Sequence, residues 1–188
     1  METAKMLELI SVQRHDFLNH LQIISGLLQL KKEERARKYI LEVGQDIKRL
    51  SKISHLKEPE AAAAFLIGYN QAVNAQILVD FNVQVDLAKC EVPGSLIGAV
   101  LSSLLEYLIN LLAPPEVTER ALNIDLLPVE GGYQFVFRFV CTTGANNMDM
   151  NNMIINLQRK LALYGGKVEV ADDKVYQRIE LFLPAADA

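Results

Sequence analysis

The chain has 188 residues, of which 51% are hydrophobic, and its formal net charge is −4. This length can hold one ordinary domain, or a small helical module and one compact domain, and the apolar content excludes wholesale disorder. The acidic balance argues against nucleic acid as the main partner, because phosphate backbones attract basic surfaces.

Charge divides the chain into two parts. Residues 1–57 carry 11 Lys and Arg against 7 Asp and Glu, whereas residues 58–188 carry 8 against 16. A basic part joined to an acidic part predicts two modules with different surfaces. We place these modules at residues 1–58 and 59–188.

The two cysteines, Cys90 and Cys141, form no CxxC pair. We interpret them as small buried hydrophobic residues in a protein of a reducing compartment. The first twelve residues lack a basic segment followed by an apolar one, so no signal peptide is predicted. These features predict a cytoplasmic location.

The first predicted element is a helical hairpin. Residues 3–30 repeat apolar side chains at alternating spacings of three and four, as in the seam of a coiled coil. A second apolar set at residues 40–50 is out of phase with the first, so we expect a turn near residues 31–34. The hairpin should end near residues 55–59. The first seam comprises Leu7, Ile10, Phe17, Leu21, Ile24 and Leu28, with Arg14 filling its one gap.

Two helices alone cannot bury stripes of this width. Two copies of the hairpin can bury them as a four-helix bundle, which predicts a homodimer. The alternative is that the hairpin packs onto the rest of its own chain.

The remainder of the chain alternates between helices and strands. We expect the predicted helices to form a layer over one face of a mixed sheet. This arrangement is an α+β sandwich. A glycine C-cap is expected at the Tyr-Gly-Gly sequence of residues 164–166. The predicted helices are 60–75, 95–112 and 150–164, and the predicted strands are 77–85, 121–129, 133–140, 167–171 and 175–183.

The most apolar segment, residues 95–113, could by length cross a membrane. It contains Glu106, two serines and a tyrosine, and two prolines follow it. We therefore predict a buried amphipathic helix and no membrane partner.

The stretch RHDFLNHLQ, residues 14–22, carries unusual chemistry inside the first helix. If Arg14 lies on the seam, His15 is turned about 100° away from it, toward solvent. Asn19 lies one turn further on and Gln22 nearly another, on the same face, with Asp16 beside them. An exposed neutral imidazole on a rigid helix can act as a nucleophile, and a phosphoryl group is its natural electrophile. The alternative is that His15 is an ordinary surface residue.

The other two histidines are interpreted as structural residues. His20 falls nearer the bundle interface and is expected to be packed and hydrogen-bonded. His55 lies near a helix C-terminus, where a protonated ring is favoured. A metal pair of His15 and His20 is not expected, because a spacing of five residues directs the rings apart.

Residues 14–30, RHDFLNHLQIISGLLQL, resemble the phosphoacceptor helix of citrate- and dicarboxylate-sensing histidine kinases and of the related sporulation-initiation phosphotransferases. The resemblance implies that His15 is the phosphoacceptor and that Asp16 and Asn19 assist it. It also implies that the hairpin dimerises. Neighbouring side chains are then expected to contact the partner, namely Arg14, Leu18 and Gln22.

The second module resembles the kinase ATP-binding domain, but it departs from that pattern at the nucleotide site. Ser103 and Tyr107 stand where two asparagines normally bind Mg²⁺ and phosphate, and a tyrosine does not readily replace an amide. Thr142, Gly144 and Asn146 stand in place of the Asp-x-Gly-x-Gly loop. Residues 152–155, Asn-Met-Ile-Ile, replace the following glycine-rich box, and the lid is too short. No P-loop sequence appears.

An intact phosphoacceptor helix with a degenerate ATP module resembles the phosphotransferases of this group more than the kinases. The resemblance implies that His15 carries a phosphoryl group between aspartates of two response-regulator receiver domains. It implies no cofactor of the chain's own, with Mg²⁺ expected on the receiver. Basic residues at the hairpin tip, Lys31 to Lys38, would suit an acidic receiver.

Three other functions stay open. The chain could be a histidine kinase core that binds ATP in an atypical way. It could be a non-catalytic dimer that binds and regulates a kinase or a receiver. It could also be a structural dimerisation module, although this leaves residues 14–22 unexplained.

Overall fold

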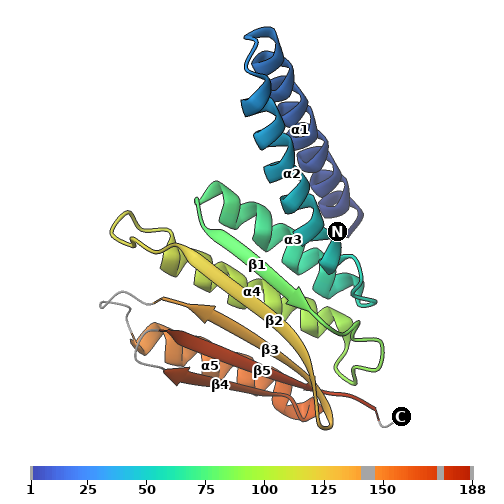
Figure 1. The fold of residues 1–188 in the computed structure, drawn as a ribbon. Helices are drawn as coiled ribbons and strands as arrows, with labels where there is room; N and C mark the ends of the chain where they lie inside the picture. Colours follow the sequence, from blue (N-terminus) through green and yellow to red (C-terminus); the bar gives the residue numbers. More distant parts are fainter. Residues whose placement is uncertain (1, 141–146, 173–175, 187–188) are drawn as a thin grey trace. The chain divides into compact units, whose positions relative to one another are not determined.

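The structure is a computed structural model, and it describes residues 2–140, 147–172 and 176–186 (Figure 1). It separates into two compact units, Met1–Arg49 and Leu50–Ala188. The predicted division of the chain into modules 1–58 and 59–188 stays a prediction.

The N-terminal unit is the predicted helical hairpin. Helix α1 spans Glu2–Gln29 and helix α2 begins at Glu33 and continues to Ile53. The backbone turns between them at Lys31, whose φ of 55° lies in the left-handed region that usually favours glycine. Its N–H bonds to the carbonyl of Leu28 at 2.9 Å, which closes the end of α1. The turn therefore falls where the change of phase predicts it, although no Gly or Pro marks it.

This hairpin leaves most of its described apolar side chains uncovered. Among the described side chains of Met1–Arg49, Ala36 alone is fully buried. Several large apolar side chains of this unit are about half exposed, which is unusual for a soluble surface. We call those on the two predicted seams the exposed stripe; it consists of Phe17, Leu21, Leu28, Ile40 and Ile47.

The C-terminal unit is built on a five-stranded sheet with the order β1-β2-β3-β5-β4. Strand β1 pairs with β2 in parallel, and all the other pairs are antiparallel. The mixed sheet predicted from the sequence is confirmed. The strands span Leu78–Val83 (β1), Ala121–Val129 (β2), Gly132–Phe139 (β3), Lys167–Asp172 (β4) and Gln177–Pro184 (β5).

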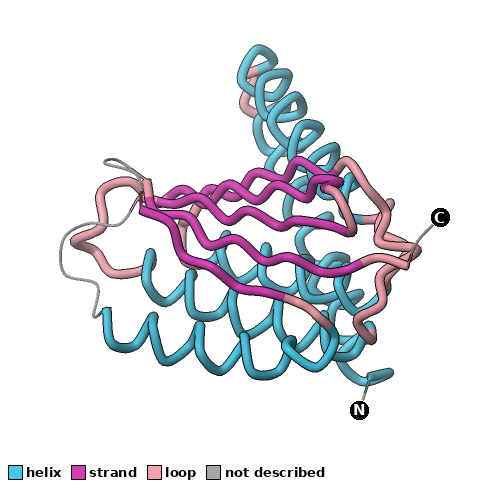
Figure 2. Tube along the Cα trace, turned by 90° about the horizontal axis from the view of Figure 1, so that it is seen from below, coloured by secondary structure: helices cyan, strands magenta, loops and turns pink. Residues whose placement is uncertain are grey.

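Helices cover one face of this sheet, as Figure 2 shows. They are α3 (Pro59–Asn74), α4 (Gly94–Leu112) and α5 (Asn147–Leu161), and α5 continues into the short 3₁₀ helix η1 (Ala162–Tyr164). Gly165 ends η1 with a φ of 74°, which confirms the predicted glycine cap. The α+β sandwich is therefore the observed fold.

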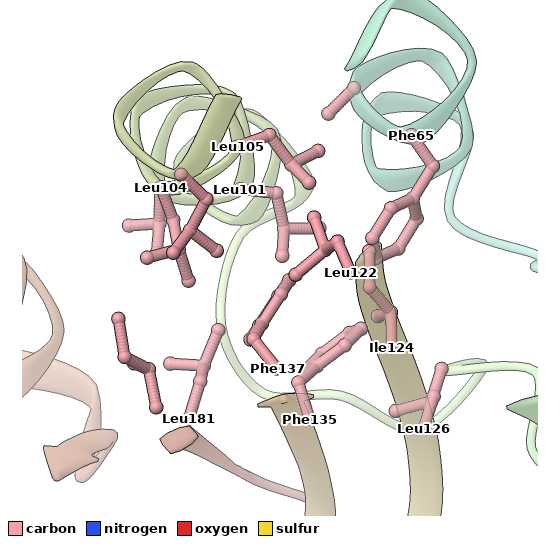
Figure 3. Packing of buried hydrophobic residues seen from close by; sticks show 14 of the residues in the cluster. Phe65, Leu101, Leu104, Leu105, Leu122, Ile124, Leu126, Phe135, Phe137 and Leu181 are labelled. Atoms are coloured by element: carbon pink, nitrogen blue, oxygen red, sulfur yellow. The ribbon is translucent and has the colours of Figure 1, made fainter. Parts of the chain in front are cut away.

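The core lies between these helices and the sheet (Figure 3). The Phe65 ring meets the Phe81 ring edge-on, with centroids 5.5 Å apart and an interplanar angle of 77°. The core side chains labelled in Figure 3 are Phe65 from α3, Leu101, Leu104 and Leu105 from α4, and Leu122, Ile124, Leu126, Phe135, Phe137 and Leu181 from the sheet.

Helix α4 is the most apolar element of this core. Within the described residues it is the one helix that length and composition would allow to cross a membrane. Leu101, Leu104 and Leu108 on it are completely inaccessible to solvent. The segment is thus the buried core helix that the sequence predicts.

The end of α2 and the residues after it belong to the C-terminal unit. Ile53 and Leu56 are buried in its core. Lys57 is tied twice to Asp86, through its backbone N–H to the Asp86 carbonyl at 2.8 Å and through Nζ to Oδ2, also at 2.8 Å. This attachment explains why the compact unit begins at Leu50, before the last turn of α2.

Both edge strands of the sheet carry a side-chain contact. Lys52 Nζ donates to the Phe81 carbonyl of β1 at 2.8 Å. At β4, the Gln158 carbonyl accepts from the Val168 N–H at 2.7 Å, and its amide donates to the Gly166 carbonyl at 3.3 Å. Backbone groups engaged in this way are not available to pair with another chain.

Candidate active site

The candidate site is centred on His15 in helix α1. Its side chain is exposed, and the amide nitrogen of Asn19 lies 3.1 Å from its Nδ1. The two residues are four apart, and this spacing places them one above the other on a helix. The regular backbone of α1 therefore holds the pair together.

This contact can set the tautomer of the imidazole. An amide N–H that faces Nδ1 donates to it, which places the ring proton on Nε2. A 180° turn of the Asn19 amide exchanges its nitrogen and oxygen, two atoms of nearly equal size. The oxygen then accepts a hydrogen bond from the Nδ1–H, and the lone pair of Nε2 faces outward. Asn19 can thus present His15 as a nucleophile at Nε2.

The remaining predicted site residues surround this pair on α1. Arg14, Leu18 and Gln22 are all exposed, as contact with a partner requires. Asp16 lies in α1, but its side chain is outside the described part of the structure. The chemical roles of all six residues stay predictions.

His20 has a partner that the sequence analysis did not name. Its Nδ1 lies 2.8 Å from the Tyr39 hydroxyl of α2, and the two ring centroids are 5.8 Å apart. The prediction that His20 is packed and hydrogen-bonded is therefore confirmed. The sequence shows Tyr39 only as an aromatic residue with a polar tip beside the apolar set of α2, which does not indicate that its partner is His20.

Some of the residues that the resemblance aligned with a nucleotide site lie on two helices of the structure. Ser103 and Tyr107 are half-buried and lie one turn apart on α4. Residues 152–155, which replace the glycine-rich box, form part of helix α5. Thr142, Gly144 and Asn146 lie outside the described residues. Across the described ranges, no group of three or more His, Cys, Asp or Glu residues could hold a metal ion.

The tip of the hairpin is less basic than its lysines and arginines suggest. Lys31, Lys32 and Arg35 line a shallow open depression together with Glu33 and Glu34. Both glutamates lie in the first turn of α2, where they complement the positive end of the helix. Lys38 pairs with Glu42 at 3.8 Å on an exposed surface, where such a pair contributes little.

Comparison with solved structures defines the class of the fold. A histidine kinase of Acinetobacter baumannii, AdeS, matches with a TM-score of 0.55 and 11% identity, over 92% of this chain and 98% of that one. The catalytic domain of histidine kinase ThkA matches with a TM-score of 0.55 and 12% identity, over 68% and 90%. Identities this low show the fold alone. The C-terminal unit therefore has the fold of a histidine kinase catalytic domain.

The N-terminal segment matches a more particular group. Residues 1–56 match the family model described as the alpha-helical domain of the SpoOB-type sensor kinase. Sporulation initiation phosphotransferase B of Bacillus subtilis (strain 168) is 42% identical over 64 residues, which are 34% of this chain and 33% of that protein. The resemblance seen in residues 14–30 is thereby confirmed, and it spans one third of the length of that relative.

Proposed function

We propose that this protein is a phosphorelay phosphotransferase in which His15 is the phosphoacceptor. It takes a phosphoryl group from an aspartyl phosphate on one response-regulator receiver and passes it to an aspartate on another, without using ATP. The observation that carries this proposal is the exposed His15 ring with the Asn19 amide 3.1 Å away, within the segment that matches the SpoOB-type helical domain. A cytoplasmic location fits this role.

The transfer needs mainly positioning and an open path in line with the bond that breaks. The reactive arrangement that we propose has the Asn19 amide turned so that its carbonyl oxygen accepts a hydrogen bond from the Nδ1–H of His15. The lone pair of Nε2 forms the N–P bond, while the P–O bond to the receiver aspartate breaks and the carboxylate leaves with the electron pair. The second receiver reverses these steps with its own aspartate. Mg²⁺ on each receiver offsets the negative charge of the phosphoryl group and the carboxylate.

Recognition of the receiver falls to the exposed neighbours of His15. Arg14 offers a charged donor, Leu18 an apolar contact and Gln22 an amide on the same helix. These three side chains are our proposed docking residues. A large receiver surface can reach His15 because the imidazole lies on the outside of a helix instead of in a pocket.

The active form is proposed to be a homodimer. The exposed stripe gathers large apolar side chains of the kind that marks a contact surface. Two hairpins that bring their stripes together form a four-helix bundle. Because His15 is turned away from the seam, each copy keeps its site open.

Two alternatives have some support. The kinase-type fold of the C-terminal unit also suits a non-catalytic dimer that binds and regulates a kinase or a receiver. The same fold would suit an atypical kinase core. A non-catalytic regulator has no use for the contact between Asn19 and His15. A kinase core would use it, but it would also need ATP bound in the C-terminal unit, where Ser103 and Tyr107 stand in place of the two expected asparagines.

The deciding experiment uses a receiver domain that carries a ³²P-labelled aspartyl phosphate with Mg²⁺. Purified wild type, His15→Ala and His55→Ala would each be mixed with it, because His55 is also an exposed histidine and serves as the matched control. We expect acid-labile, base-stable label on wild type and His55→Ala, and none on His15→Ala. Label that appears only from γ-labelled ATP would favour the kinase. Stable complex formation without label would favour the binding regulator.

A further inference from the structure

The contact between His20 and Tyr39 connects α1 to α2 at the residue that follows Asn19 of the candidate site. His20 follows Asn19 in the sequence, so its side chain points about 100° away from the Asn19 direction. Its Nδ1 reaches the Tyr39 hydroxyl of α2 at 2.8 Å. Consecutive residues of α1 thus serve two purposes, because Asn19 contacts His15 and His20 contacts α2.

We propose that the hydrogen bond between His20 and Tyr39 is a positioning contact for phosphoryl transfer at His15. It fixes the rotation and the axial register of α1 against α2, and so directs the face of His15 and Asn19 outward. This inference rests on the proposed function and adds two positioning residues to it. A receiver must align its aspartyl phosphate with Nε2 in a narrow geometry, and a misplacement of about 1 Å can lower such rates about a hundredfold.

The weak packing of this hairpin makes a directional contact more important. Ala36 is the one described side chain of Met1–Arg49 that is fully buried. Apolar faces of helices can rotate and slide past one another at small cost, because hydrophobic contacts have no preferred direction. A 2.8 Å hydrogen bond between two ring side chains tolerates little of this movement. The pair therefore selects one register among those that the apolar residues allow.

The electrostatic surroundings keep the donor in place. Burial raises the pKa of the Tyr39 hydroxyl, and the negative charges of Glu42 and Asp46 raise it further. The phenol thus stays protonated around neutral pH and can donate to Nδ1 of a neutral His20 ring. The ring centroids, 5.8 Å apart and tilted by 51°, add an aromatic contact that does not depend on the hydroxyl.

The test removes the hydrogen bond while it keeps the rings. Tyr39→Phe deletes one hydroxyl, and Tyr176→Phe deletes one from an exposed tyrosine of the C-terminal unit as the matched control. The phosphoryl-transfer rate at saturating receiver and the half-saturating receiver concentration are measured separately, beside the thermal unfolding midpoint. We expect Tyr39→Phe to slow transfer about tenfold with an unchanged half-saturating concentration. Tyr176→Phe should behave as wild type.

Substitutions of His20 test the same contact from the other side. His20→Ala should slow transfer at least as much as Tyr39→Phe. The double variant should be no slower than His20→Ala, because both changes remove one interaction. His20→Asn places an amide oxygen near the position of Nδ1 and should restore most of the rate. A purely structural role would predict instead that rate losses follow the loss of folded protein, with no rescue by asparagine.

Wild-type rates in both Tyr39→Phe and His20→Ala would overturn the proposal. If wild type itself takes no label from any receiver, the proposed function fails, and the positioning contact is then judged by NMR. The ¹⁵N chemical shifts of the His15 ring report its tautomer and its surroundings. A change of these shifts in Tyr39→Phe supports the positioning contact, whereas identical shifts in Tyr39→Phe and wild type refute it.

Discussion

The Asn19 amide lies 3.1 Å from Nδ1 of His15, one helical turn away along α1. The orientation of the Asn19 amide can therefore set the tautomer of the His15 ring, and so which ring nitrogen is the nucleophile, before any partner binds. Substitutions of Asn19 test this directly. Asn19→Ala should slow transfer about tenfold at saturating receiver, since a net hydrogen bond contributes roughly 0.5–1.5 kcal/mol.

Asn19→Asp separates the role of the oxygen from that of the whole side chain. A carboxylate can only accept, so it should hold the proton on Nδ1 and retain more of the transfer rate than Asn19→Ala. Rapid-quench measurement of the phosphohistidine would give both rates. Equal rates for wild type and Asn19→Ala would show that this amide does not orient His15.

The exposed stripe predicts how the chain associates. Leu21→Glu places a charge in the proposed dimer interface, where desolvation of the carboxylate would be costly. We expect analytical ultracentrifugation to find a dimer for wild type and a monomer for Leu21→Glu. Leu163→Glu is the matched control, because Leu163 lies in η1 and is 87% exposed. A monomeric wild type would remove the four-helix bundle from the proposal.

We expect alanine substitutions of a buried and an exposed leucine to change the free energy of unfolding by very different amounts. Leu104 is 0% exposed and Leu163 is 87% exposed. Leu104→Ala leaves a cavity and should lower the free energy of unfolding by about 2–5 kcal/mol. Leu163→Ala should change it by less than about 0.5 kcal/mol, as is usual for surface positions. Urea titrations of both variants, followed by circular dichroism, would measure the difference.

The contact between Lys57 and Asp86 predicts a loss of stability in acid. The hydrogen bond from the Lys57 ammonium and a further one from the Ala88 N–H lower the pKa of the Asp86 carboxyl group. A lowered folded-state pKa stabilises the fold above the unfolded value, about 3.9, and this contribution is lost as pH falls through the folded value. Asp86→Asn should therefore be less stable than wild type at pH 7, and the difference should shrink below about pH 4. A difference that stays constant from pH 7 to acid would contradict the ionic origin.

For Glu58, we expect the dependence of stability on pH to be opposite to that of Asp86. Burial raises the pKa of its carboxyl group, and the neighbouring Glu60 carboxyl group adds to the rise. Its side chain fills the space that a Cβ on Gly94 would occupy. A raised folded-state pKa means that ionisation destabilises the fold, fully so above the folded value and not at all below the unfolded value, about 4.3. Glu58→Gln should be more stable than wild type at pH 7 and equal to it in acid, by urea titration at each pH. A less stable Gln variant at pH 7 would refute this account.

Most of the fold could be predicted from local patterns. The strands predicted at residues 77–85, 121–129 and 133–140 are present in the structure as β1, β2 and β3. The out-of-phase apolar sets predicted the turn that falls at Lys31. These signals are readable because side-chain periodicity follows directly from backbone geometry.

Contacts between distant residues were not readable in this way. No local pattern indicates that Tyr39 meets His20, or that Lys57 is tied to Asp86. The strand order, in which β5 lies between β3 and β4, also depends on how all five strands assemble. Such pairings are chosen by the summed packing of many residues.

Local patterns are enough to predict the element types, the helical hairpin and the residues that share a face with His15, because a helix turns by a constant angle per residue. The burial of the end of α2 in the C-terminal unit and the contact of His20 with Tyr39 become visible only in the folded chain. Periodicity is encoded by neighbours along the chain, whereas a specific partner is selected by shape and hydrogen bonding across space.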